Sequence, residues 1–191
     1  KQNSDRYMGV KGRRPQREQC EEFIDPPLIT DVEAIINMAT SNGFIDAKGN
    51  VQLDKVAQSE NIEVEYVDLP STESGFFRSS NGVYVIGINK KHNSRRQRFT
   101  FAHELGHYFL HKGTGDTAFS DEVFYRIENS SSIEYAANEF AARLLIPENR
   151  LTEKLNQGMI DLRELAEEFE VSIAAMEYRV KSLGYSIERY E

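Results

Sequence analysis

The segment RFTFAHELGHYFLH, residues 98 to 111, places three of the chain's four histidines within nine residues. His103 and His107 are four positions apart, so in an α-helix their side chains lie about 40° apart around the axis and about 6 Å apart along it. Apolar residues occupy most other positions of the segment, as expected for a helix that is covered on several sides. The segment therefore predicts a largely buried helix with two imidazoles directed towards one point.

Two imidazoles that meet at one point can bind a single metal ion, and Glu104 directly follows the first of them. This is the spacing H-E-x-x-H, in which the glutamate is rotated away from the metal-binding face and can act on a water molecule. We expect His103 and His107 as metal ligands and Glu104 as the catalytic base. The expected metal is Zn²⁺, with Mn²⁺ as an alternative native or activating ion.

A catalytic zinc site needs a third protein ligand, for which the sequence offers two candidates. His111 lies eight residues after His103, roughly 12 Å along the same helix, so both rings could reach one ion only in a nearly linear arrangement. Glu134, in the helical segment SIEYAANEFAARLLIP, is the better candidate, and Asn138 follows one turn later on the same face. We expect Glu134 to bind the metal, Asn138 to hydrogen-bond a ligand histidine, and His111 to pack nearby or support the site.

Two segments, RRQRFTFAHELGHYFLH and IEYAANEFAARLLIP, follow a recognisable pattern: a basic, aromatic lead-in to H-E-x-x-H, then E-x-x-A-N-x-F-A-x-x-L-L-x-P. In this the chain resembles the ImmA/IrrE family of metallopeptidases over roughly residues 30 to 185. The resemblance implies metal-binding roles for His103, His107 and Glu134, and the catalytic role for Glu104. It also implies a cytoplasmic zinc endopeptidase that cleaves or inactivates a helix-turn-helix repressor, which relieves repression in a stress-response or mobile-element setting.

Peptide hydrolysis also requires a group that stabilises the developing oxyanion. Tyr108 and His111 on the histidine helix are candidates, and so are Tyr125 and Arg126 in the link between the two motif segments. We favour Tyr125 and Arg126, although any of the four could instead be structural.

Patterns along the rest of the first 150 residues predict an α+β fold. TDVEAIINMATSNG and VQLDKVAQSEN read as helices, and IEVEYVDL, GFFRSS and VYVIGINK read as strands that include a hairpin at SNG. We expect a small antiparallel sheet packed on a helix bundle that carries the histidine helix. GFFRSS or VYVIGINK could add an extended peptide substrate to the sheet edge, or both could only form the core of the sheet.

The last third of the chain contains DLRELAEEFEVSIAAMEYRVKSLGY, which reads as a helix, a tight turn and a second helix, much like a helix-turn-helix. This segment supports an alternative function, a DNA-binding transcriptional regulator with a structural zinc. A third alternative is a metal-containing anti-repressor that binds a repressor without cleaving it. The second helix presents a mixed set of side chains and not a basic one, so direct DNA binding is not expected; the set is Glu177, Tyr178, Arg179 and Lys181.

Charge and composition suggest the domain plan. Residues 1 to 20 hold six basic and two acidic side chains, which leaves −12 for the rest of a chain whose formal net charge is −8. We expect a basic, flexible leader over 1–27, a metallopeptidase domain over 28–150, and a C-terminal helical segment over 151–191 packed on that domain. Apolar runs are too short to span a bilayer, and a single cysteine fits a reducing compartment, so no membrane role is expected.

Overall fold

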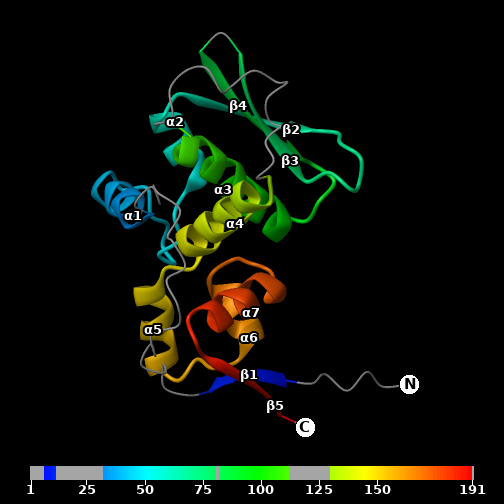
Figure 1. The fold of residues 1–191 in the computed structure, drawn as a ribbon. Helices are drawn as coiled ribbons and strands as arrows, with labels where there is room; N and C mark the ends of the chain where they lie inside the picture. The colour runs from blue at the N-terminus through cyan, green and yellow to red at the C-terminus, as the bar shows by residue number, and fades with distance from the viewer. Residues whose placement is uncertain (1–6, 12–31, 81, 112–129, 191) are drawn as a thin grey trace. The chain divides into compact units, whose positions relative to one another are not determined.

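The computed structural model describes residues 7–11, 32–80, 82–111 and 130–190 of the 191-residue chain. The chain forms two compact units, one made by Leu28–Leu145 and the other by Lys1–Pro27 together with Ile146–Glu191 (Figure 1). The first unit contains α1 (Val32–Ser41), α2 (Leu53–Ser59), β2 (Ile62–Val67), β3 (Gly75–Ser80), β4 (Val83–Asn89), α3 (Ser94–His111) and α4 (Ser130–Leu145). The second contains β1 (Tyr7–Lys11), α5 (Glu148–Asn156), α6 (Leu162–Glu168), α7 (Ile173–Ser182) and β5 (Ser186–Tyr190).

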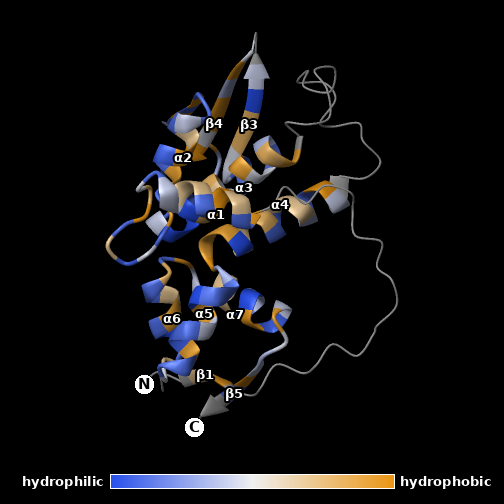
Figure 2. Cartoon of the chain, turned by 90° about the vertical axis from the view of Figure 1, so that its left-hand side faces the viewer, coloured by the Kyte–Doolittle hydropathy of each residue, from blue (hydrophilic) through white to orange (hydrophobic). Residues whose placement is uncertain are grey.

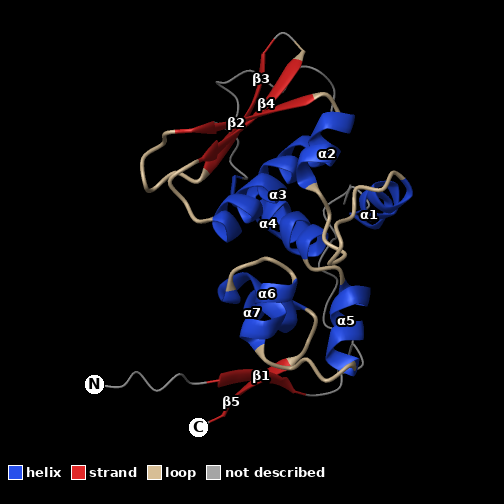
Figure 3. Ribbon diagram, turned by 180° about the vertical axis from the view of Figure 1, so that it is seen from behind, coloured by secondary structure: helices blue, strands red, loops and turns tan. Residues whose placement is uncertain are grey.

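The three-stranded sheet of the first unit has the order β2-β4-β3 (Figure 3). The α+β class is confirmed, and β3 and β4 form the expected antiparallel hairpin. The sheet as a whole is mixed, however, because β2 runs parallel to β4, with Ile62 opposite Tyr84. β4 takes the central position because its apolar side chains are the most completely buried, with Ile86 and Ile88 at 0% and 1% exposure.

Helix α3 packs against the sheet through aromatic side chains. Tyr108 of α3 contacts Tyr84 of β4 and Phe77 of β3 at ring-centroid distances of 5.0 and 6.2 Å, both edge to face. Leu105 and Ala102, which precede Tyr108 by three and six positions, are completely buried. Figure 2 shows the apolar residues of α3, α4 and β4 in orange. The histidine helix is thus a core element, as its composition predicted.

Helices α3 and α4 approach each other closely at a glycine. A Cβ atom on Gly106 would lie 3.0 Å from the Phe140 ring and 3.3 Å from the Cα of Ala137, so only glycine fits this crossing without a shift. Ala137 and Ala141 are completely buried on the facing side of α4. The small residues on both helices bring the start of α4 next to the histidines of α3.

The second unit contains the expected helix-turn-helix-like pair. Asp161 caps α6 by accepting hydrogen bonds from the N–H groups of Arg163 and Glu164, and Ser172 caps α7. The turn between the helices includes Glu170, which has a φ of 55°. This left-handed backbone conformation allows the chain to reverse direction in a tight turn.

A two-stranded sheet completes this unit and corrects one expectation. Residues 7–11, which fell within the predicted flexible leader, form β1 and pair antiparallel with β5, with Val10 opposite Ile187. Val10 is 5% exposed, and its N–H donates a hydrogen bond to the carbonyl oxygen of Ile160 at 2.8 Å. The pairing joins the two ends of the sequence, so no local pattern indicates it. No helix among the described residues combines the length and apolar character needed to cross a membrane.

Candidate metal and catalytic centre

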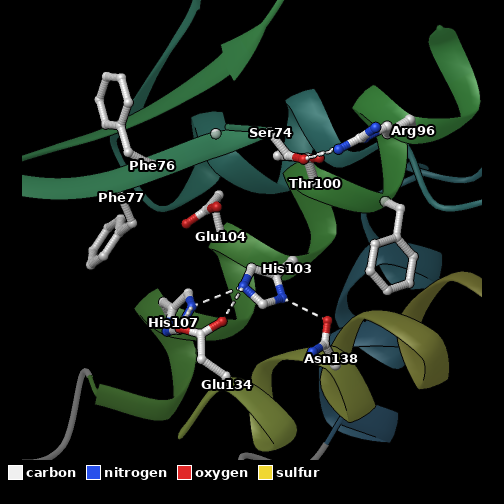
Figure 4. A pocket seen from close by; sticks show the side chains of 12 residues that line it. Ser74, Phe76, Phe77, Arg96, Thr100, His103, Glu104, His107, Glu134 and Asn138 are labelled. Carbon is white, nitrogen blue, oxygen red and sulfur yellow. Dashed lines mark hydrogen bonds and ion pairs between the residues drawn. The ribbon is translucent and has the colours of Figure 1, made fainter. Parts of the chain in front are cut away.

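The two histidines of the H-E-x-x-H motif converge on one point, as their spacing predicted (Figure 4). The Nε2 atoms of His103 and His107 lie 3.0 Å apart, and the ring planes are inclined by 80°. Two nitrogens bound to one tetrahedral zinc ion at 2.0–2.1 Å are roughly 3.3 Å apart. The imidazoles therefore stand close to the separation that a shared metal ion requires.

Glu134 of α4 reaches the same point from the neighbouring helix. Its two carboxylate oxygens lie 3.2 Å from Nε2 of His103 and 3.3 Å from Nε2 of His107. One donor atom from each of the three residues lies within 4.8 Å of the others. Two imidazole nitrogens and one carboxylate oxygen that line a cleft are a donor set that suits a catalytic zinc ion.

The protonation of this cluster also suits a metal ion. Burial lowers the pKa of His103, and the charge of His107 adds to this effect, so the neutral, metal-binding form of the ring is favoured. Hydrogen bonding to His107 holds the pKa of Glu134 below its usual value and keeps the carboxylate ionised. The donor set therefore fits zinc both in geometry and in charge.

Asn138 forms the hydrogen bond to a motif histidine that the sequence predicted. It lies one turn after Glu134 on α4, and its Oδ1 accepts a hydrogen bond from Nδ1 of His103 at 3.0 Å. A proton on Nδ1 leaves the lone pair of Nε2 directed towards Glu134 and His107. This hydrogen bond favours the tautomer of His103 whose Nε2 is unprotonated.

Glu104 lies beside this cluster but outside it. The residue is 7% exposed, and burial raises its pKa to about 7; the charge of His107 opposes this shift and that of Glu134 adds to it. Strand β3 passes directly over the carboxylate, since a Cβ on Gly75 would lie 3.4 Å from Glu104 Oε1 and 2.5 Å from Cγ2 of Thr100. A carboxylate in this setting can exchange a proton near neutral pH, as a general base must.

The cluster and Glu104 open into a cleft of about 590 Å³ between α3, α4 and the start of β3. Gly75, Phe76 and Phe77 of β3 form part of its wall. Since β3 is an outer strand of its sheet, GFFRSS has an edge beside the cleft. VYVIGINK, the other strand considered for substrate pairing, is the central β4 and has both edges occupied, so it is not available for pairing.

The structure locates only part of the four residues suggested as oxyanion contacts. The hydroxyl of Tyr108 donates a hydrogen bond to Glu60 Oε2 at 2.9 Å, and the side chain is 3% exposed, so it packs in the core and does not face the cleft. His111 is the last residue of α3, and its side chain is not described. Tyr125 and Arg126 lie outside the described residues.

Sequence reasoning missed four further cleft residues, Ser74, Arg96, Phe99 and Thr100. Arg96 and Thr100 precede His103 by seven and three positions, which places them on nearly the same helix face. Helical periodicity could have found these two. Ser74 reaches the cleft only through the pairing of β3, which no local pattern predicts.

The chain is similar to proteins that are named as metallopeptidases. Residues 57–181 match the model of the peptidase M78 family, described as the IrrE N-terminal-like domain. The chain is 32% identical over 108 residues to the metallopeptidase ImmA of Bacillus subtilis, a match that covers 53% of this chain and 57% of that protein. It is also 32% identical over 124 residues to the radiation response metalloprotease IrrE of Deinococcus radiodurans, which covers 61% of this chain and 36% of that protein.

The chain therefore spans little more than half of one curated relative and about a third of the other. Among solved structures, a Mycobacterium tuberculosis transcriptional regulator superposes with a TM-score of 0.58 at 21% sequence identity, covering 79% of this chain and 46% of that one. At this identity the likeness concerns the fold alone.

Proposed function

The chain belongs to the peptidase M78 family with its IrrE N-terminal-like domain, and we propose that it is a zinc-dependent endopeptidase. One observation carries the proposal: the donor atoms of His103, His107 and Glu134 lie within 4.8 Å of one another, in a cleft that also holds the buried carboxylate of Glu104. The family and the relatives named as metallopeptidases support the same activity.

The residues of the cleft suit peptide hydrolysis. Bound zinc would supply Lewis-acid polarisation of the scissile carbonyl and of the attacking water. Glu104 takes a proton from that water and passes it to the leaving amide nitrogen, a role for which a pKa near 7 is well placed. Asn138 keeps the His103 ring in its metal-binding orientation. The outer edge of β3 holds an extended substrate by backbone hydrogen bonds above Glu104.

We extend the proposal to the substrate, a helix-turn-helix transcriptional repressor that is cleaved or inactivated in the cytoplasm. Two lines support this. The sequence resembles a family whose members act on such repressors, and one relative is named a radiation response metalloprotease, which fits a stress-response setting.

The decisive experiment incubates the zinc-loaded protein with a helix-turn-helix repressor encoded beside its gene, with and without chelator. We expect cleavage that the chelator abolishes and that Glu104→Gln lowers by several orders of magnitude while zinc is retained. Glu139→Gln, which changes a glutamate of α4 outside the cleft, serves as the control. Cleavage by Glu104→Gln at the wild-type rate would show that the mechanism is wrong, and tight binding without cleavage would favour the anti-repressor alternative.

Metal binding by Glu134 is tested separately. Glu134→Ala removes one ligand and one negative charge, so zinc measured by elemental analysis after dialysis should fall well below one equivalent. If the variant still holds one equivalent tightly, Glu134 is not a ligand.

A further inference from the structure

Arg96 lies in the cleft at a distance from the proposed metal ligands. It precedes His103 by seven residues, so it stands about 10 Å away along α3 on nearly the same face of the helix. Among the described residues that line the cleft, it is the single lysine or arginine (Figure 4). The far end of the cleft therefore has a positive charge of its own.

The guanidinium group is held in place by a neutral partner. Its Nε and Nη2 atoms donate hydrogen bonds to Oγ of Ser74 at 3.3 and 2.9 Å. A guanidinium has five N–H donors, so three remain after these two bonds. Within the part of the chain that the structure describes, no carboxylate forms an ion pair with Arg96, whereas Arg78 pairs with Glu65 and Arg150 with Glu168.

The helix adds to the positive potential at this point. The first turn of α3 contains no acidic residue, although the partial positive charge of a helix N-terminus favours one there. Arg96 instead adds a cation to that end of the helix. The exposed guanidinium, oriented by Ser74, is thus prepared for an anion that the described residues do not supply.

The direction of β3 indicates where on a peptide this anion would lie. Ser74 immediately precedes β3, and Gly75 lies over Glu104, so the path from Glu104 to Arg96 follows β3 backwards. A peptide paired antiparallel with β3 runs from its N-terminus to its C-terminus along this path. The backbone positions of His103 and Arg96 are about 10 Å apart along α3, which equals about three residues of an extended peptide at about 3.3 Å per residue.

We propose that Arg96 determines substrate specificity by binding a carboxylate two to four residues on the C-terminal side of the scissile bond. The inference rests on the proposed peptidase function and names the substrate chemistry of that site. The carboxylate belongs either to an Asp or Glu side chain or to the C-terminus of a peptide, because both present the same planar pair of oxygens to a guanidinium.

The test uses fluorogenic peptides, amidated at the C-terminus, that carry Glu, Gln or Lys at each of the first four positions after the cleaved bond. With zinc-loaded wild-type protein we expect kcat/KM to be about tenfold higher for Glu than for Gln at one of the second to fourth positions. Arg96→Ala should abolish this preference, and Arg96→Glu should replace it by a preference for Lys. Arg95→Ala, which changes the adjacent arginine outside the cleft, should retain the preference for Glu.

A second peptide set separates the two sources of the carboxylate. Peptides that end at the preferred position are compared with a free C-terminal carboxylate and with an amide. If the free acid is preferred and this preference depends on Arg96, the C-terminal carboxylate is a ligand of Arg96. If the free acid is not preferred but an internal Glu is, the ligand is the Glu side chain. Equal cleavage of acidic and neutral peptides in both sets would overturn the proposal.

Failure of the proposed function gives a different result, because no peptide would then be cleaved by the wild-type protein. In that case the affinities of labelled Glu and Gln peptides are compared by fluorescence anisotropy on the wild-type protein and Arg96→Ala. About tenfold tighter binding of the Glu peptide that disappears in Arg96→Ala would support the carboxylate site, and equal affinities would reject it.

Discussion

At the scale of single residues, burial gives Glu104 its chemical character. A glutamate on an exposed helix face is a solvated charge, whereas this one is 7% exposed beneath the backbone of β3, and its pKa rises to about 7. The same position beside His107 directs the carboxylate into the cleft (Figure 4). The residue type came from the motif, but its proton affinity comes from its surroundings.

This raised pKa predicts a stability effect in protein stripped of metal by chelator. The folded state binds the Glu104 proton more tightly than the unfolded state, so its contribution to stability is fully present below about pH 4.5 and lost as the pH rises through about 7. The free energy of unfolding of Glu104→Gln, relative to that of the wild type, should therefore rise by on the order of 2–3 kcal/mol between pH 4 and pH 8. Urea denaturation of both proteins at the two pH values measures this, and an equal difference at both would contradict it.

Asn138 predicts a defect in metal binding without a change of ligand. Asn138→Ala removes the acceptor that holds Nδ1 of His103, so zinc affinity should fall roughly tenfold to a hundredfold. Competition with a chelating dye measures the affinity. Tyr135→Ala, at a 62% exposed position of the same helix outside the cleft, is the matched control. Equal affinity of Asn138→Ala and wild type would remove Asn138 from the site.

At the scale of elements, the crossing of α3 and α4 assembles the proposed metal site, because it brings a carboxylate from one helix to two histidines of the other. The crossing is close only because Gly106 faces Ala137 and Phe140. Glycine inside a helix ordinarily costs about 0.5–1 kcal/mol relative to alanine, so its presence here reflects packing and not helix formation.

Gly106→Ala tests which effect dominates. Helix propensity alone predicts a more stable protein, but the added methyl would meet the Phe140 ring at 3.0 Å and the backbone of Ala137 at 3.3 Å. We expect a loss of about 1–3 kcal/mol in the free energy of unfolding, with weaker zinc binding as α4 moves away. Urea denaturation and dye competition measure the two effects. A rise in stability would show that Phe140 and Ala137 move to accommodate the methyl group at no net cost in free energy.

At the scale of the whole molecule, all the proposed metal ligands belong to the unit Leu28–Leu145. Zinc that binds only the folded site stabilises it by about 4 kcal/mol when its free concentration is a thousand times Kd. We expect chelation to increase amide hydrogen exchange in α3 and α4 and to leave α6 and α7 unchanged, as measured by mass spectrometry. A uniform increase across both units would show instead that the metal stabilises the whole chain.

The second unit has a helix-turn-helix-like pair, yet its side chains do not favour DNA. Arg179 is 5% exposed and donates from Nε to the carbonyl oxygen of Ile146, and Lys181 pairs with Glu177. Neither side chain presents a free cation to a phosphate backbone.

We therefore expect no specific binding of duplex DNA in anisotropy titrations over a range of salt. A variant with Arg13, Arg14 and Arg17 replaced by serine removes basic charge from the N-terminal segment without altering β1. Weak binding that this variant loses would reflect nonspecific attraction. Nanomolar, sequence-specific binding that it retains would favour the regulator alternative.

Features that depend on neighbours within a helical turn or two could be predicted from the sequence. The four-residue spacing of His103 and His107 places both rings on one face of any helix, and the same periodicity relates Glu134 to Asn138. Alternating and helical patterns were also sufficient for the α+β class and for the hairpin of β3 and β4.

The contacts between segments distant in the sequence could not be predicted and are seen in the folded structure alone. It placed β2 parallel beside β4, joined β1 to β5 across the length of the chain, and directed Tyr108 to Glu60 and Arg96 to Ser74. It also buried Glu104 and thereby raised its pKa. Strand pairing, burial and side-chain partners depend on free energies summed over contacts remote in sequence, whereas helical spacing follows from backbone geometry that every residue shares.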